Sequence, residues 1–179
     1  PELVSSLLHK ELPEPALAFD IVDLGCGTGR LGPLVAPFKK TLVGVDLSPG
    51  MLDKAVARQV YDRTECADLI PFLIRHPSDF DLAMCLDTLV YFGDLDELLR
   101  AAFAALRPGG RLFCTIELSG DASGDGFTLH HAGRYAHTPR YVNNALLRAG
   151  FALEHEIPFD VRTELGIAVP GLLLGARRP

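Results

Sequence analysis

The sequence carries little positive charge and no basic cluster. Its 179 residues include 17 lysines and arginines against 23 aspartates and glutamates, which gives a net charge of −6. The nearest approach to a basic block is the pair Arg177 and Arg178 at the end of the chain. Proteins that follow duplex nucleic acid need clustered cations to neutralise phosphates, so this balance argues against a nucleic-acid partner.

Cysteines are equally sparse. The four, Cys26, Cys66, Cys85 and Cys114, are far apart and form no CxxC pair. A zinc ribbon is therefore excluded, a disulfide-stapled scaffold is disfavoured at this size, and no metal site is expected. Reduced thiols in a cytoplasmic compartment are the simpler interpretation.

Long apolar runs are missing too. The longest, 82–92, is interrupted by Asp87 and falls short of the roughly 18 residues that a membrane-spanning helix requires. There is no charged-then-apolar leader and no internal repeat, so we expect no membrane partner. The chain begins at Pro1 and not at methionine, which leaves room for a longer parent protein.

The sequence does contain a regular alternation of strand and helix patterns. Its 48% hydrophobic and 22% charged residues fit a single globular domain over 1–179. Strands are expected at 18–24, 41–46, 64–66, 80–86, 111–117, 151–157 and 169–177, and helices at 30–38, 49–58, 94–106 and 138–150. This order predicts a doubly wound, Rossmann-like α/β sheet that is mostly parallel, with an antiparallel strand at one edge. Ligands of such sheets bind beyond the carboxyl ends of the strands.

Helix starts and one long connection can be predicted from local chemistry. Ser48, the Asp94–Glu97 pair and Thr138 are expected to cap helices, and Gly150 is expected to end the last one. Residues 119–137 are rich in glycine and histidine without periodicity, which predicts a loop on the acceptor side of a binding site.

A glycine-rich turn follows the first strand. The run DLGCGTG at 23–29 places three glycines at alternate positions, where the backbone can turn tightly and approach a ligand. Gly27, Gly29 and Gly32 also satisfy the dinucleotide pattern G-x-G-x-x-G, so the glycines alone leave two cofactors open.

Acidic residues at the strand ends help to distinguish between the two cofactor hypotheses. Asp23, Asp46, Asp68 and Asp87 all fall at or just beyond expected strand ends. Four carboxylates along one edge would repel a pyrophosphate and would attract a ligand that carries hydroxyls, an ammonium group and a sulfonium. This pattern favours S-adenosyl-L-methionine over a nicotinamide dinucleotide.

Five segments in order resemble the successive motifs of class I S-adenosylmethionine-dependent methyltransferases. They are DLGCGTG (23–29), VDLSPGML (45–52), ADL (67–69), FDL (80–82) and LRPGGRL (106–112). The resemblance covers 18–117 and implies a seven-stranded sheet, with S-adenosyl-L-homocysteine as the product. The tail, 133–179, is similar to bacterial predicted methyltransferases associated with tetratricopeptide repeats, which implies a repeat region on the N-terminal side of this chain.

The resemblance also implies a set of cofactor-binding residues. Asp46 would hold the ribose diol, Leu47 and Met51 would flank the adenine, and Asp68 would meet its amino group. Asp68 equally suits a turn cap, and Met51 lies on an apolar helix face, so a structural role stays open for both. The full set is Asp23, Gly25, Cys26, Gly27, Thr28, Gly29, Asp46, Leu47, Met51, Ala67, Asp68, Leu69 and Leu86.

The acceptor side is less constrained, because methyl transfer depends largely on alignment. The stretch 86–92 lacks the Asn/Asp-Pro-Pro-aromatic turn of family members that methylate nucleobases or glutamine amides, so a small molecule or a protein side chain is expected. Asp87 and His131 are the catalytic candidates, since a carboxylate or an imidazole can take an acceptor proton. The residues predicted to contact the acceptor are Tyr91, His130, Tyr135 and His137.

Two other functions remain open at this point. The overlapping glycine pattern allows a nicotinamide-dependent oxidoreductase. A non-catalytic domain that keeps the cofactor fold would share every motif listed above.

Overall fold

The computed structural model describes residues 2–11, 19–120, 124–131, 133–164 and 166–179. The seven strands of its main sheet are β1 (Phe19–Leu24), β2 (Lys39–Asp46), β3 (Arg63–Cys66), β4 (Phe80–Cys85), β5 (Leu106–Glu117), β8 (Ala152–Glu164) and β9 (Ile167–Arg177). The helices are α1 (Glu2–Glu11), α2 (Gly32–Val35), α3 (Pro49–Val56), α4 (Leu69–Ile74), α5 (Asp96–Ala105) and α6 (Pro139–Ala149), with short 3-10 turns η1 (Ala36–Phe38) and η2 (Leu89–Tyr91).

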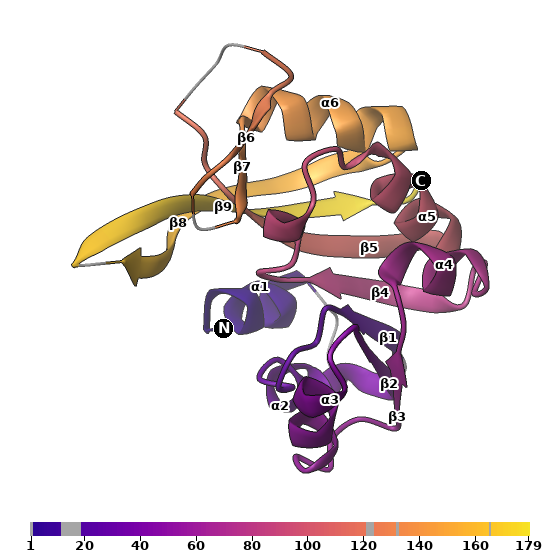
Figure 1. Ribbon diagram of the computed structural model, residues 1–179. Coiled ribbons are helices and arrows are strands. Elements are labelled where there is room, and N and C mark those ends of the chain that lie inside the picture. Colours follow the sequence, from indigo (N-terminus) through magenta and orange to yellow (C-terminus); the bar gives the residue numbers. More distant parts are fainter. Residues whose placement is uncertain (1, 12–18, 121–123, 132, 165) are drawn as a thin grey trace.

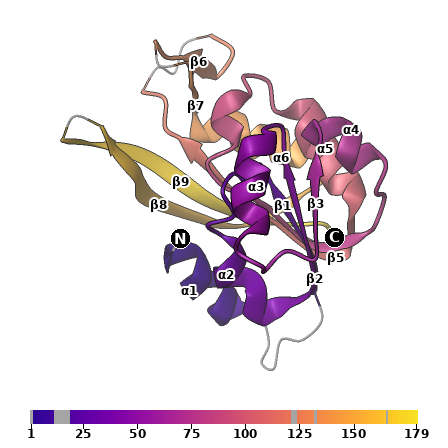
Figure 2. The same ribbon diagram turned by 60° about the horizontal axis from the view of Figure 1, so that its bottom comes forward.

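The main sheet has seven strands, the number that the resemblance implied. Its strands run β3-β2-β1-β4-β5-β9-β8 (Figure 1). The first five are parallel, and β9 pairs antiparallel with both β5 and β8. The prediction of a mostly parallel sheet with an antiparallel strand toward one edge is confirmed, with β8 completing that edge. The outer part of the β8–β9 hairpin projects beyond the helices in both views (Figures 1 and 2).

Two apolar cores cover the two faces of this sheet. One core packs α4, α5 and α6 against one face, with Phe72, Leu98 and Leu146 fully buried in it. The other packs α1 and α2 against the opposite face around Leu8 and Val35. Helix α1 therefore lies against the body of the domain, and Figure 2 shows it close to α2. Sandwiching the sheet between helices leaves the ends of its strands as the places where a ligand can enter.

Several element boundaries differ from those predicted. The 30–38 helix is only α2 followed by η1, because Pro37 interrupts the α-helical pattern. Strand β5 already starts at Leu106, and the Pro-Gly-Gly run that was expected to separate helix from strand is absorbed as an irregularity in its pairing with β4. Helices α1 and α4 were not predicted. Residue 18, assigned to the first strand, lies outside the described residues.

The predicted ends of α6 are confirmed, the Ser48 cap is wrong, and Asp94 accepts a backbone N–H at the start of α5 without the predicted capping box. Thr138 accepts a hydrogen bond from the Tyr141 N–H at the start of α6, and Gly150 ends that helix in the left-handed conformation. Ser48 precedes α3 without a side-chain cap. The Asp94–Glu97 capping box does not form, because Asp94 instead accepts from the nearby Asp96 N–H at 2.7 Å.

The predicted loop at 119–137 contains a small hairpin. Strands β6 (Phe127–Leu129) and β7 (Tyr135–His137) pair antiparallel there, and aromatic contacts join Phe127 to Tyr135 and Tyr141. The sequence did not indicate these strands, because each has only three residues. Residues 121–123 and 132 of the predicted loop lie outside the described residues. Among the helices that are described, none has the length and apolarity to cross a bilayer.

Candidate active site

A large cavity lies beyond the carboxyl ends of β1, β2 and β4, where the parallel sheet predicts a ligand. Its volume is about 1230 Å³, compared with roughly 300–1,000 Å³ for a pocket that holds one drug-sized ligand. The lining includes Asp23, Gly25, Cys26, Gly27, Thr28, Arg30, Leu31, Asp46, Leu47, Ser48, Met51, Asp68 and Leu69. It also includes Leu3, Val4, Leu86, Asp87, Thr88, Tyr91, Phe92, Thr115, Pro158, Phe159, Asp160, Val161 and Leu173.

The glycine-rich turn forms the floor of one end of this cavity. Gly25, Gly27 and Gly29 all have positive φ, which L side chains rarely adopt. The Gly25 and Cys26 N–H groups donate to the Val45 carbonyl at 2.8 and 3.0 Å, which fastens the turn to β2. No described atom lies within 4 Å of the place where a Cβ on Gly27 would stand, so a ligand can approach the backbone there.

Gly29 has a different role from the one the resemblance implied. It is buried and does not line the cavity. A Cβ on Gly29 would come within 2.8 Å of the Tyr61 ring and 3.0 Å of the Ala55 backbone. Its small size is therefore required by packing beneath the turn.

Asp46 ties the glycine turn to the start of α3. One carboxylate oxygen accepts from the Gly27 N–H and the other from the Ser48 N–H, both at 2.8 Å. A carboxylate has about four acceptor positions, so capacity remains for hydroxyl groups of a ligand. Leu47 and Met51 line the cavity near it with 68% and 41% of their surface exposed, so both can contact an apolar group.

Asp68 performs the capping role that its sequence context allowed and also faces the cavity. Its carboxylate accepts from the Ile70 N–H at 3.0 Å and so caps α4. Leu69 lines the cavity next to it, whereas Ala67 does not and instead donates its N–H to the Asp46 carbonyl.

Asp23 is the buried carboxylate of the site. It is 3% exposed, and its Oδ2 accepts from the Tyr61 hydroxyl at 2.7 Å. Burial raises the pKa of Asp23 to about 7, and the like charge of Asp46 acts in the same direction, while the Tyr61 hydrogen bond opposes the shift. A cation bound beside Asp23 would favour its ionised form.

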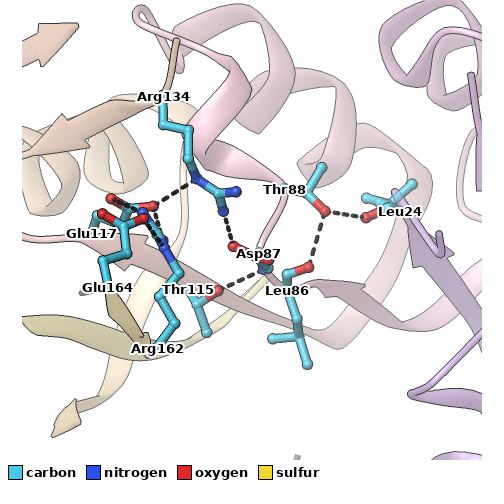
Figure 3. A network of polar contacts seen from close by, with 9 residues as sticks. All are labelled: Leu24, Leu86, Asp87, Thr88, Thr115, Glu117, Arg134, Arg162 and Glu164. Carbon is cyan, nitrogen blue, oxygen red and sulfur yellow. Dashed lines mark hydrogen bonds and ion pairs between the residues drawn. The ribbon is translucent and has the colours of Figure 1, made fainter. Parts of the chain in front are cut away.

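Asp87 follows β4, lines the cavity and takes part in a network of ion pairs (Figure 3). Its φ of 55° is in the left-handed region, a strained conformation for a residue other than glycine. Its backbone N–H donates to the Thr115 hydroxyl at 2.8 Å, and its carboxylate pairs with Arg134. These contacts hold the strained residue in place.

Glu117, at the end of β5, anchors the same network. It is 4% exposed and accepts from Arg134 Nε at 2.9 Å, and it pairs with both terminal nitrogens of Arg162 on β8. Burial acts to raise the pKa of Glu117, but the two guanidinium groups hold it below its usual value. The network thus fastens the segment before β7 and the β8–β9 hairpin to the edge of the cavity.

The remaining predicted acceptor residues are separated by the fold. Tyr91 lines the cavity, and the Arg134 guanidinium lies 5.6 Å from the centre of its ring. His130 and His131 are exposed, and Tyr135 packs on Phe127, all outside the lining as the described residues define it. His137 is fully buried and its Nε2 lies 3.1 Å from the Gly93 carbonyl oxygen; burial lowers the pKa of this imidazole.

Sequence reasoning missed the residues that support the site. Tyr61, Thr115, Glu117, Arg134 and Arg162 come from four separate segments, with Thr115 and Glu117 together on β5, and none belongs to a recognisable motif. The glycines of the turn were the one available signal for Tyr61. A glycine is needed where a bulky side chain packs directly against the backbone, as the Tyr61 ring does at Gly29. No pattern in the sequence pointed to the ion pairs.

The fold and this cavity define a Rossmann-like α/β domain that binds its ligand at the carboxyl ends of parallel strands. Comparison with known proteins gives the family. The protein-family model described as a methyltransferase domain matches residues 22–112, which is half of the chain. The chain belongs to this family, whose methyl donor is S-adenosylmethionine, and the nicotinamide alternative is set aside.

Relatives and solved structures are consistent with this membership. The ubiquinone biosynthesis O-methyltransferase of Coxiella burnetii is 30% identical over 97 residues, which cover 52% of this chain and 41% of that protein. The chain thus matches about two fifths of the length of this curated relative. An S-adenosylmethionine-dependent methyltransferase from Mesorhizobium loti is 28% identical with a TM-score of 0.73, covering 97% of this chain and 96% of its own.

A third comparison concerns the fold alone. The magnesium protoporphyrin IX methyltransferase of Synechocystis PCC 6803, solved with bound S-adenosylmethionine, is 18% identical with a TM-score of 0.74. The alignment covers 99% of this chain and 77% of that one. The same architecture therefore accommodates the donor in another protein.

Proposed function

We propose that this chain transfers the methyl group of S-adenosylmethionine to a hydroxyl group of an apolar small molecule. The observation that carries the proposal is that three carboxylates around the cavity have no cationic partner among the described residues. In the described part of the chain, Asp23, Asp46 and Asp68 form no ion pair, and they accept hydrogen bonds only from backbone N–H groups and the Tyr61 hydroxyl. Unpaired carboxylates favour a cationic ligand that also has hydroxyl groups to donate.

The donor end would be formed by the glycine turn and these three carboxylates. We assign the ribose hydroxyls to Asp46, the adenine to the exposed pair Leu47 and Met51, and the adenine amino group to Asp68. Asp23 would meet the ammonium group of the methionyl part. When bound, S-adenosylmethionine supplies an electrophilic methyl group on a sulfonium and leaves as the neutral thioether S-adenosylhomocysteine.

The acceptor end would be the rest of the cavity. Its walls are mainly apolar and come from three directions, with Leu3 and Val4 on α1, Tyr91 and Phe92 beside η2, and 158–161 on β8. Such walls enclose a small molecule more readily than a protein side chain on its backbone. The relative named above is an O-methyltransferase, and a hydroxyl is an acceptor group that suits a mainly apolar pocket whose carboxylates, Asp87 and Asp160, can accept its proton.

Asp87 is the residue we assign to the acceptor proton. A new oxygen–carbon bond forms as the sulfur–carbon bond breaks, and the hydroxyl proton passes to the Asp87 carboxylate or through it to water. Arg134 and Thr115 hold Asp87 in its strained conformation, which supports alignment of acceptor and methyl group. His131, which lies outside the cavity lining, has no part in this proposal.

Binding and turnover test the two ends separately. Calorimetry should detect S-adenosylmethionine and S-adenosylhomocysteine but not NAD, and Asp46→Asn should weaken both ligands by about 10-fold or more, since hydrogen bonds to a charged group contribute ~1.5–3 kcal/mol. Asp87→Asn should keep donor affinity and reduce release of S-adenosylhomocysteine with a panel of apolar phenols and alcohols. Asp53→Asn, an exposed acid on α3 outside the cavity lining, is the control. Binding of NAD alone would overturn the proposal, and donor binding without turnover of any acceptor would reduce the chain to a cofactor-binding domain.

A further inference from the structure

Tyr61 lies beneath the glycine turn, outside every motif of the sequence. A Cβ added to Gly29, Gly32 or Gly44 would come within 2.8, 3.0 and 2.9 Å of atoms in its ring. These glycines belong to the end of the turn, the start of α2 and the middle of β2. One aromatic ring thus fills the space that three side chains would otherwise need, and it supports the turn from behind.

The hydroxyl of Tyr61 reaches the buried carboxylate of the site. It donates to Asp23 Oδ2 at 2.7 Å, the distance of a strong hydrogen bond to a charged acceptor. Burial raises the pKa of the Tyr61 hydroxyl, so this group remains a donor throughout the physiological range. The other oxygen of the carboxylate is not engaged by Tyr61.

The other groups around Asp23 do not favour its ionised form. Asp46, at the end of β2, is a like charge. Cys26 in the turn and Cys85 on β4 also lie within the electrostatic influence of Asp23. Burial raises the pKa of both thiols, so they stay neutral. Among the described groups that act on Asp23, Tyr61 is the one that stabilises the carboxylate.

We propose that Tyr61 is a positioning residue that fixes the direction and the ionisation of Asp23, and thereby sets the affinity for the cationic methionyl end of the donor. The inference rests on the proposed function, because it assigns that end of the donor to Asp23. The aromatic ring shapes the turn and the hydroxyl controls the charge, so the two contributions can be separated by removing the hydroxyl alone.

The sign of the pH dependence follows from this arrangement. A cation binds the ionised form of Asp23, so donor affinity should rise with pH through the titration of this carboxylate near pH 7. Removing the Tyr61 hydroxyl removes a donor to the ionised form and raises the pKa of Asp23. The midpoint of the affinity profile should therefore move to higher pH in Tyr61→Phe.

Calorimetry with S-adenosylhomocysteine between pH 5.5 and 9 tests the effect on binding. Tyr61→Phe should bind about 10-fold more weakly at pH 7, the scale of a hydrogen bond to a charged group. It should regain most of the affinity at pH 9. On the Asp23→Asn background the same substitution should have no further effect. Equal losses on both backgrounds would show that Tyr61 acts only through packing and would overturn the inference.

A measurement without ligand separates this inference from the proposed function. Carboxyl ¹³C NMR of the free protein should show that Tyr61→Phe raises the Asp23 titration midpoint by about one pH unit. The matched control is Tyr141→Phe. The Tyr141 hydroxyl oxygen accepts from the Leu95 N–H at 2.9 Å on the other face of the sheet. That variant should leave both the Asp23 titration and the binding profile unchanged.

The outcomes are distinct. An unchanged Asp23 titration in Tyr61→Phe would overturn the inference even if methyl transfer is found. Failure of the wild-type protein to bind S-adenosylhomocysteine at any pH would overturn both the inference and the proposed function.

Discussion

The acidic residues at the two ends of the parallel strands have different partners. At the amino ends, Asp20 on β1 and Asp81 on β4 are bridged by Arg107, at 3.0 and 2.9 Å. At the carboxyl ends of β1 and β2, Asp23 and Asp46 form no ion pair among the described residues and accept from the backbone and a hydroxyl instead. One edge is neutralised within the protein, and the other keeps negative charge that a cationic ligand can meet.

The carboxyl edge itself has two parts. The part that we assign to the donor is built mainly from backbone hydrogen bonds around the glycine turn, and the part that we assign to the acceptor is held by the ion pairs of Glu117, Arg134 and Arg162. The unpaired acids Asp23 and Asp46 favour a cationic ligand, whereas the nearly buried Glu117, shared by two arginines, is a structural joint. Asp87 pairs with Arg134, but its side chain is 59% exposed and so remains open to an acceptor.

Substitution of Glu117 should have the largest effect. Glu117→Gln leaves two arginines without their shared, nearly buried partner, and such a loss destabilises a protein by roughly 3–5 kcal/mol. Urea unfolding measures the change. The same network orders the acceptor end, so turnover should fall while donor affinity is retained in the folded fraction.

The matched control for this prediction is Glu164→Gln. Glu164 also accepts from Arg162, at 2.5 Å, but its side chain is 51% exposed. Exposed pairs contribute about 0–1 kcal/mol. Similar losses in the two variants would contradict the distinction between a structural joint and a surface pair.

Substitution of Arg107 should have a smaller effect, confined to stability. Its side chain is 38% exposed, so Arg107→Gln should destabilise the fold by about 1 kcal/mol through the loss of two partly exposed ion pairs. Because Arg107 lies at the edge opposite the cavity, calorimetry should find unchanged affinity for S-adenosylhomocysteine. A loss of donor affinity larger than about 2-fold would break the division between the two edges.

The last prediction is a change of stability with pH, measured as a slope. The pKa of Asp23 is about 7 in the folded protein against 3.8 for an unperturbed aspartate, so between these pH values the folded state holds a proton that the unfolded state has released. Stability should therefore fall as pH rises from about 4 to 7, by at most ~1.4 kcal/mol per pH unit, and then level off. The difference between wild type and Asp23→Asn in urea titrations across this window isolates the contribution, and a difference that does not change with pH would contradict the assignment.

Much of the fold could be predicted because its signals are local. Buried strands appear as short apolar runs, Thr138 and Gly150 delimit α6, and the order of elements restricts the topology to a parallel sheet with β9 reversed. Helix α4 was missed because it has only six residues, and the β6–β7 hairpin because its strands have three each. Short elements are stabilised by their neighbours, so their own sequence carries little signal.

The donor end of the site was predictable for the same reason. Asp23 and Asp46 lie at the carboxyl ends of β1 and β2, and parallel strands bring these ends together, so sequence position already places the two residues at the same edge. The histidines near β6 and β7 had chemistry that suited an acceptor site, yet burial and hairpin pairing moved them away from the cavity.

The sequence by itself determined the sheet, the glycine turn and the acids at the strand ends, because each follows from the pattern of adjacent residues. Only the tertiary structure decided which acids form ion pairs. It also placed the Tyr61 ring against Gly29 and brought two arginines from distant segments to Glu117. The physical reason is that charge pairing and close packing depend on distances across the folded chain. The net charge of −6 gave no indication of how its acids would be divided between structural joints and a binding site.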